Sequence, residues 1–220
     1  MKIFIIGITG AIGGLLAQKL LDGGDEVGGL VRREEQQREL ESRGIRAHLG
    51  DLASMSADDL RATLGGIDAI VFAAGSNGGA KDLTRAIDGD GVDTAIAAAL
   101  GAGVERLVLV SVLPEAGRES GLSDDEEYYF AVKKEADVAL AHSALDWVIL
   151  RPSMLLDGDG AGTVSLSAAE LHGDITRDDV ASTLVELLHE TRINRQILEL
   201  DHGTTPIADA VRANVRVATG

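Results

Sequence analysis

Two side chains able to exchange protons stand four residues apart, at Tyr129 and Lys133. Residues at this spacing share one face of a helix, and a nearby ammonium group lowers the pKa of a phenol from about 10. Such a tyrosine can donate a proton to a carbonyl that receives hydride, or accept one in the reverse reaction. Ser111 can hydrogen-bond the same carbonyl oxygen. A structural interpretation also exists, because such pairs occur on solvated helix faces and Tyr128 is a rival for the role.

A glycine-rich segment near the N-terminus predicts a dinucleotide site. The apolar run 3–6 leads directly into Gly7, Gly10 and Gly13, and apolar residues then recur at helical spacing. A buried strand, a glycine turn and an amphipathic helix in this order present backbone N–H groups to a pyrophosphate. The glycines would serve the tight turn, the close approach of the backbone, and the packing of the helix on the strand. The spacing G-x-x-G-x-x-G differs from the usual G-x-G-x-x-G.

Two arginines after the second expected strand, 26–31, bear on the choice of coenzyme. NAD sites carry an acidic residue about 20 positions after the glycine motif, whereas this chain has Arg32 and Arg33 there. A guanidinium binds phosphate oxygens in pairs and keeps its charge, so it suits the 2′-phosphate of NADP. We therefore expect NADP(H) rather than NAD. The alternative is that both arginines only balance Glu34 and Glu35.

The elements that must position these residues alternate along the chain, as in a doubly wound parallel sheet. Further strands are expected at 45–49, 69–73, 106–112, 147–150 and 196–200, with helices at 34–43, 57–64, 83–100, 123–143 and 176–190. Ligands bind at the carboxyl ends of strands in such sheets. The expectation is one α/β domain over 1–220, a Rossmann fold, in which 152–220 adds a small lid on the substrate side.

Composition argues against several other classes of function. The net charge of −16 disfavours nucleic acid and anionic membranes, which attract basic patches. The chain has no cysteine, which excludes disulfides and thiolate catalysis, and its histidines lack metal-ligand spacing. Without a signal-peptide pattern, the expected protein is cytoplasmic, acts on a small molecule and holds no metal.

Together the motifs resemble those of the short-chain dehydrogenase/reductases. They are most similar to the atypical, NmrA-like NAD(P)-binding branch of that superfamily, and the likeness spans nearly the whole chain. The matching motifs are the glycine segment, Arg32, Gly50-Asp51-Leu52, Ala73-Ala74-Gly75, Ser111, Tyr129-x-x-x-Lys133 and Arg151-Pro152. Each motif is weak alone, but the set in this order is specific for the fold and the cofactor.

The resemblance implies a role for each matching residue. The backbone at Thr9, Ala11 and Ile12 would hold the pyrophosphate, and Arg32 the 2′-phosphate. The adenosine would lie along a further group of residues: Asp51, Leu52, Ala73, Ala74 and Gly75.

The same resemblance implies a catalytic set of Ser111, Tyr129 and Lys133, with Lys133 also bound to the nicotinamide ribose. Pro152 and Ser153 would approach the nicotinamide. One departure is that no helix asparagine can be matched to the residue that completes the proton relay in ordinary members.

Three functions agree with these motifs. The first is an NADP(H)-dependent oxidoreductase acting on a small carbonyl, quinone-like or flavin-like acceptor, with Tyr129 as general acid/base tuned by Lys133. The second is a non-catalytic NADP(H) redox sensor that binds a protein partner. The third is an NAD(P)-dependent epimerase or isomerase, which the short C-terminal part disfavours. The intact Tyr–Lys pair favours an enzyme, and a homodimer is a further expectation.

Overall fold

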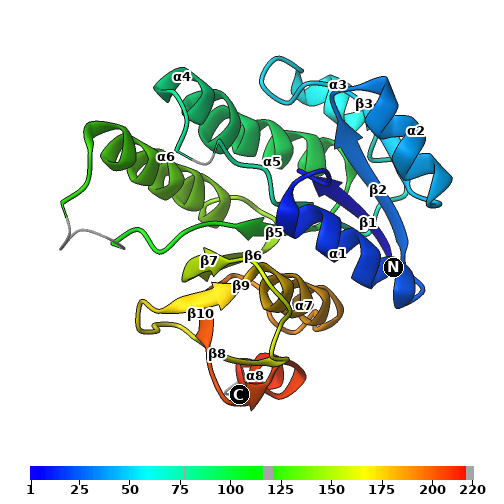
Figure 1. Ribbon diagram of the computed structural model, residues 1–220. Helices are drawn as coiled ribbons and strands as arrows, with labels where there is room; N and C mark the ends of the chain where they lie inside the picture. The colour runs from blue at the N-terminus through cyan, green and yellow to red at the C-terminus, as the bar shows by residue number, and fades with distance from the viewer. Residues whose placement is uncertain (77, 116–120, 217–220) are drawn as a thin grey trace.

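The computed structural model describes residues 1–76, 78–115 and 121–216 of the chain. Up to residue 152 it alternates strands and helices in the expected order (Figure 1). The strands are β1 (Lys2–Ile6), β2 (Glu26–Val31), β3 (Arg46–Leu49), β4 (Ala69–Phe72), β5 (Arg106–Val110) and β6 (Asp146–Pro152). The helices are α1 (Ala11–Asp22), α2 (Glu34–Ser42), α3 (Ala57–Arg61), α4 (Lys81–Thr84), α5 (Gly91–Ala102) and α6 (Asp124–Ala141), with a π-helical segment, η1 (Arg85–Asp90), between α4 and α5.

These strands form a parallel sheet in the order β3-β2-β1-β4-β5-β6. The chain starts at β1 in the middle, runs outward to β3, and then crosses back to β4 on the other side. The loops after β1 and β4 therefore diverge, and such a switch point is where ligands bind in open α/β sheets. The predicted Rossmann fold is confirmed.

Residues after Pro152 form the helix expected at 176–190, α7 (Arg177–His189), and the strand expected at 196–200, β10 (Gln196–His202). They add four short strands that the sequence analysis missed, β7 (Met154–Leu156), β8 (Thr163–Ser167), β9 (Asp174–Thr176) and β11 (Thr205–Pro206), and α8 (Ile207–Ala213) follows β11. Strand β10 joins the main sheet parallel to β6, and β8 and β11 follow in antiparallel pairing. Strands β7 and β9 form a small separate sheet. That 152–220 acts as a lid on a substrate stays a prediction.

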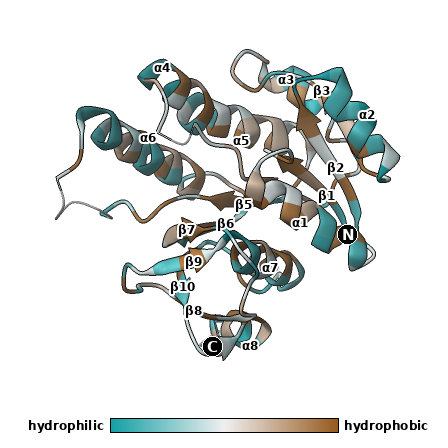
Figure 2. Cartoon of the chain, viewed as in Figure 1, coloured by the Kyte–Doolittle hydropathy of each residue, from teal (hydrophilic) through white to brown (hydrophobic). Residues whose placement is uncertain are grey.

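Strand β1 is held by two hydrophobic cores, one on each face of the sheet. Ile3 and Ile5 face the cluster built with α1 and α7, while Phe4 and Ile6 face the cluster built with α3, α5 and α6. All four side chains are fully buried, and each is worth about 1.5–3 kcal/mol when removed from water. Figure 2 shows hydrophobic residues, in brown, along the central strands of the sheet, and hydrophilic residues, in teal, on helices such as α2 and α6. The turn that follows β1 thus leaves a rigid strand.

Two helix starts agree with the sequence. Ser123 caps α6, with its hydroxyl accepting from the Glu126 N–H at 3.3 Å in a capping box, and the Thr176 hydroxyl caps α7 by accepting from the Asp179 N–H at 3.1 Å. The helix expected at 83–100 differs, since a π-helical segment interrupts it. No helix in the described part of the chain has the length and apolar character needed to cross a membrane.

Candidate coenzyme cleft and catalytic residues

A cleft of about 760 Å³ opens beyond the carboxyl ends of β1 to β4, within the size range of small-molecule sites. Most of the residues expected to bind a coenzyme line it. These are Gly7, Thr9, Gly10, Ala11, Ile12, Arg32, Asp51, Leu52, Ala73, Ala74 and Gly75. They come together because each group directly follows the end of a parallel strand.

Two glycines shape the corner between β1 and α1. Gly7 has a φ of +93°, and a Cβ there would lie 2.5 Å from the Ala74 nitrogen. A Cβ on Gly13 would overlap the Gly7 carbonyl oxygen, so α1 packs directly against the turn. The turn and packing roles expected of the glycines are confirmed at these positions.

The N-terminus of α1 is available to an anion. Gly10 is its N-cap and supplies no side-chain cap, and the first turn has no acidic residue. The first N–H groups of a helix have no partner within the helix, and the helix dipole favours negative charge there. Because this end also lines the cleft, the residues present fit the diphosphate of a dinucleotide.

The structure separates the two arginines. Arg32 is exposed, lines the cleft, and has no hydrogen bond or ion pair with any residue that the structure describes. Arg33 lies at the start of α2, where its Nε is 3.4 Å from the Glu35 carboxylate. Arg32 is therefore free to take a phosphate, whereas Arg33 has the charge-balancing place considered as the alternative.

Lys133 lies beneath the cleft rather than in it. Its ammonium group is buried, donates to the Val110 carbonyl oxygen at 3.1 Å, and lies 3.5 Å from the Asp88 Oδ1. Asp88 comes from η1, is fully buried, and accepts from the Ser76 N–H at 2.9 Å through its other oxygen. The lysine is thus paired with a carboxylate that the sequence analysis did not single out.

The expected lowering of the Tyr129 pKa is wrong for this arrangement. Burial, and then the negative charge of Asp88, raise the pKa of the phenol well above its ordinary value. The physical reason is first that burial disfavours the charged phenolate, and second that the Asp88 carboxylate repels it. A phenol is already protonated at neutral pH, and this shift moves Tyr129 further from ionisation.

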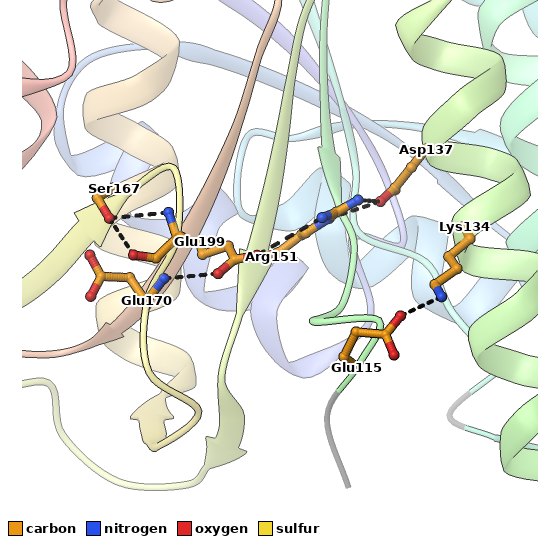
Figure 3. A network of polar contacts seen from close by, with 8 residues as sticks. Glu115, Lys134, Asp137, Arg151, Ser167, Glu170 and Glu199 are labelled. Atoms are coloured by element: carbon orange, nitrogen blue, oxygen red, sulfur yellow. Dashed lines mark hydrogen bonds and ion pairs between the residues drawn. The ribbon is translucent and has the colours of Figure 1, made fainter. Parts of the chain in front are cut away.

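Ser111 lies in a second buried polar group. Arg151 donates twice to the Asp137 Oδ2, at 2.8 and 3.0 Å, and its Nη1 is 3.9 Å from Glu199 (Figure 3). Burial raises the pKa of Asp137, although Ser111 and Arg151 act against that rise. The Ser111 hydroxyl and the Asp137 Oδ1 are buried without a well-formed hydrogen bond to any described residue.

The remaining predicted residues do not line the cleft. Pro152 ends β6 and Ser153 follows it, both buried, and the Ser153 N–H donates to the Leu200 carbonyl oxygen at 2.8 Å. The structure therefore brings most of the residues expected to bind the coenzyme together in one cleft and leaves the other predicted residues outside its lining. Those outside the lining are Gly13, Arg33, Ser111, Tyr129, Lys133, Pro152 and Ser153.

Six other lining residues were not among those expected to bind a coenzyme. They are Ser76, Leu83, Ile87, Leu155, Asp157 and Arg177. They come from separate helices, strands and loops, and their meeting at one cleft depends on the tertiary fold.

Comparisons with known proteins agree with this geometry. A family model described as NAD(P)H-binding matches residues 7–191. A Bacillus subtilis protein named "Uncharacterized sugar epimerase YhfK" is 40% identical over 214 residues, which cover 96% of this chain and 99% of the relative. A provisionally named NAD-dependent epimerase/dehydratase from Bacillus halodurans superposes with a TM-score of 0.87 at 32% identity, covering 97% and 99% of the two chains. The Escherichia coli anaerobilin reductase ChuY superposes with a TM-score of 0.76 at 27% identity, covering 92% and 97%.

Proposed function

This chain belongs to the NAD(P)H-binding family, and from that premise we propose that it is an NADP(H)-dependent oxidoreductase acting on a small carbonyl, quinone-like or flavin-like acceptor. The observation that carries the proposal is the cleft itself, which is lined both by a helix N-terminus without a side-chain cap and by Arg32, which has no ion pair with any described residue. The reductase activity in the name of ChuY supports the same reaction class.

Two parts of the cleft lining would recognise two different phosphate groups of the coenzyme. The N–H groups at the start of α1 would bind the diphosphate, and Arg32 would bind the 2′-phosphate. Asp51 and Leu52 also line the cleft and would contact the adenine. Bound NADPH supplies the hydride.

The proton would come from Tyr129. A phenol is protonated at neutral pH, and the raised pKa of Tyr129 makes the phenolate needed for the base role harder to form. Lys133 is paired with Asp88, and the Asp88 carboxylate opposes ionisation of the phenol. Ser111 would orient the acceptor oxygen. These roles favour reduction of the acceptor over oxidation of a product.

The test combines binding with turnover. Calorimetry should detect NADPH binding to the wild-type protein, and nicotinamide absorbance should fall in the presence of an accepted aldehyde, quinone or flavin. Tyr129→Phe should abolish turnover without loss of NADPH binding. Tyr128→Phe is the matched control, because it removes the neighbouring phenol, and it should leave turnover nearly unchanged.

The other outcomes identify the competing functions. Absence of NADPH binding by the folded protein refutes the proposal. Tight binding without turnover on any acceptor supports a redox sensor. Conversion of one sugar epimer to the other without net consumption of NADPH supports an epimerase, the activity in the name of the Bacillus subtilis relative.

A further inference from the structure

An ion pair from the C-terminal part of the chain faces the coenzyme cleft and has no part in the proposed chemistry. Arg177, the first residue of α7, lies 2.7 Å through its Nη1 from the Oδ1 of Asp157, which follows β7. Both residues line the cleft, together with Gly10, Ala11 and Ile12 at the start of α1. A cation and a carboxylate thus line the same cleft as the expected diphosphate site.

The two members of this pair differ in how firmly they are held. The Arg177 side chain is 27% exposed, whereas that of Asp157 is 92% exposed. Helix α7 packs on α1, and Lys19 on α1 lies 2.8 Å from Asp178, the residue next to Arg177. The arginine therefore starts from a fixed helix beside α1, while the carboxylate projects into water.

We propose that Arg177 is a second anion-binding residue of the cleft, whose guanidinium exchanges the Asp157 carboxylate for the diphosphate of the coenzyme. The inference rests on the proposed function and extends it. An ion pair with a highly exposed carboxylate is weak, so the exchange costs little. An arginine binds two phosphate oxygens at once with better geometry. Among the described lining residues, Arg32 and Arg177 are the only cations, and Arg32 is assigned to the 2′-phosphate.

Charge removal on the two sides of the pair gives opposite results under this proposal. Arg177→Gln should weaken NADPH binding about tenfold, the loss of one charge-assisted contact. Asp157→Asn breaks the same ion pair but removes the competing anion, so it should tighten NADPH binding. Arg177→Lys keeps the charge and should recover part of the affinity. Calorimetry with each purified variant measures these constants, and the melting temperature without ligand checks folding.

A fragment of the coenzyme tests whether Arg177 contacts the diphosphate or the 2′-phosphate. Adenosine 2′-phosphate has no diphosphate, so its affinity should be equal for the wild type and Arg177→Gln. Loss of affinity for this fragment, or weaker NADPH binding in both Arg177→Gln and Asp157→Asn, would show that the pair only maintains the cleft.

The same variants distinguish this proposal from an alternative in which Arg177 binds the carboxylate of an acidic acceptor. If the wild type binds NADPH, and Arg177→Gln leaves that affinity unchanged but raises the KM for a carboxylate-bearing acceptor, the diphosphate assignment is overturned and the proposed function stands. If the wild type does not bind NADPH, the proposed function fails first.

Discussion

Replacing Asp88 by asparagine tests the buried charge pair that underlies the candidate catalytic residues. The Asp88 Oδ1 lies 3.5 Å from the Lys133 Nζ, and the two side chains are 0% and 3% exposed. At that distance two unit charges attract by about 5 kcal/mol with an effective dielectric constant of about 20. Asparagine can keep the hydrogen bond from the Ser76 N–H, so the change removes mainly charge.

The expected loss in the free energy of unfolding is about 3–5 kcal/mol, the usual cost of leaving one member of a buried ion pair alone. Lys133 keeps its bond to the Val110 oxygen, which argues against a larger loss. Urea denaturation followed by circular dichroism measures the change. Asp90→Asn is the matched control, since it breaks an exposed pair with Arg85 in the same segment and should cost less than about 1 kcal/mol.

The same substitution should lower the pKa of Tyr129, because the carboxylate charge that opposes the phenolate is gone. The chain has two tyrosines, so tyrosinate absorbance in a Tyr128→Phe background follows Tyr129 alone. The reasoning is refuted if Asp88→Asn loses no more stability than Asp90→Asn, or if the pKa of Tyr129 stays where it was.

Two further substitutions test the cleft. Arg32→Asp should weaken NADPH binding by about 100-fold, the loss of two charge-assisted hydrogen bonds, and should change NADH binding little. Arg33→Asp is the control and should change the binding of neither coenzyme. Equal losses of NADPH and NADH binding in Arg32→Asp would refute the 2′-phosphate assignment. Gly7→Ala should destabilise the fold by more than about 1 kcal/mol, since φ is positive and the added Cβ meets the Ala74 backbone, and it should abolish NADPH binding. Gly14→Ala, whose Cβ has ordinary contacts, is the control and should stabilise α1 by about 0.5–1 kcal/mol. A similar loss of stability in both variants would contradict the argument.

The parts of the molecule that the sequence predicts are those set by short segments. The run 3–6 followed by Gly7 specifies a buried strand and a turn, and the parallel topology then brings Arg32 and Asp51 to the same edge of the sheet. Local chemistry decides each step, because periodicity, glycine spacing and capping act within one element. The outline of the coenzyme cleft therefore follows from the order of a few local motifs along the chain.

The parts that were missed depend on contacts between distant segments. Lys133 contacts Asp88, which lies 45 positions earlier in the chain, and no local sequence pattern around either residue predicts this contact. The π-helical segment that carries Asp88 has no simple periodic signal, and β7 and β9, with three residues each, are too short for one. For this reason the sequence placed Lys133 beside Tyr129 correctly on one helix, yet indicated the wrong direction for the pKa of the phenol.

Charges of alternating sign extend from Tyr129 under the carboxyl edge of the sheet. Asp88 pairs with Lys133, the charge of Lys133 also reaches Asp137, and Asp137 pairs with Arg151. Apolar side chains of similar size would stabilise a fold at least as well as such buried pairs, so stability alone does not account for the row. In the proposed reaction its effect is electrostatic, because each cation beneath the cleft is matched by a carboxylate and Tyr129 faces the carboxylate end. A phenol held protonated there can deliver its proton only when a developing oxyanion draws it, which ties proton transfer to hydride transfer.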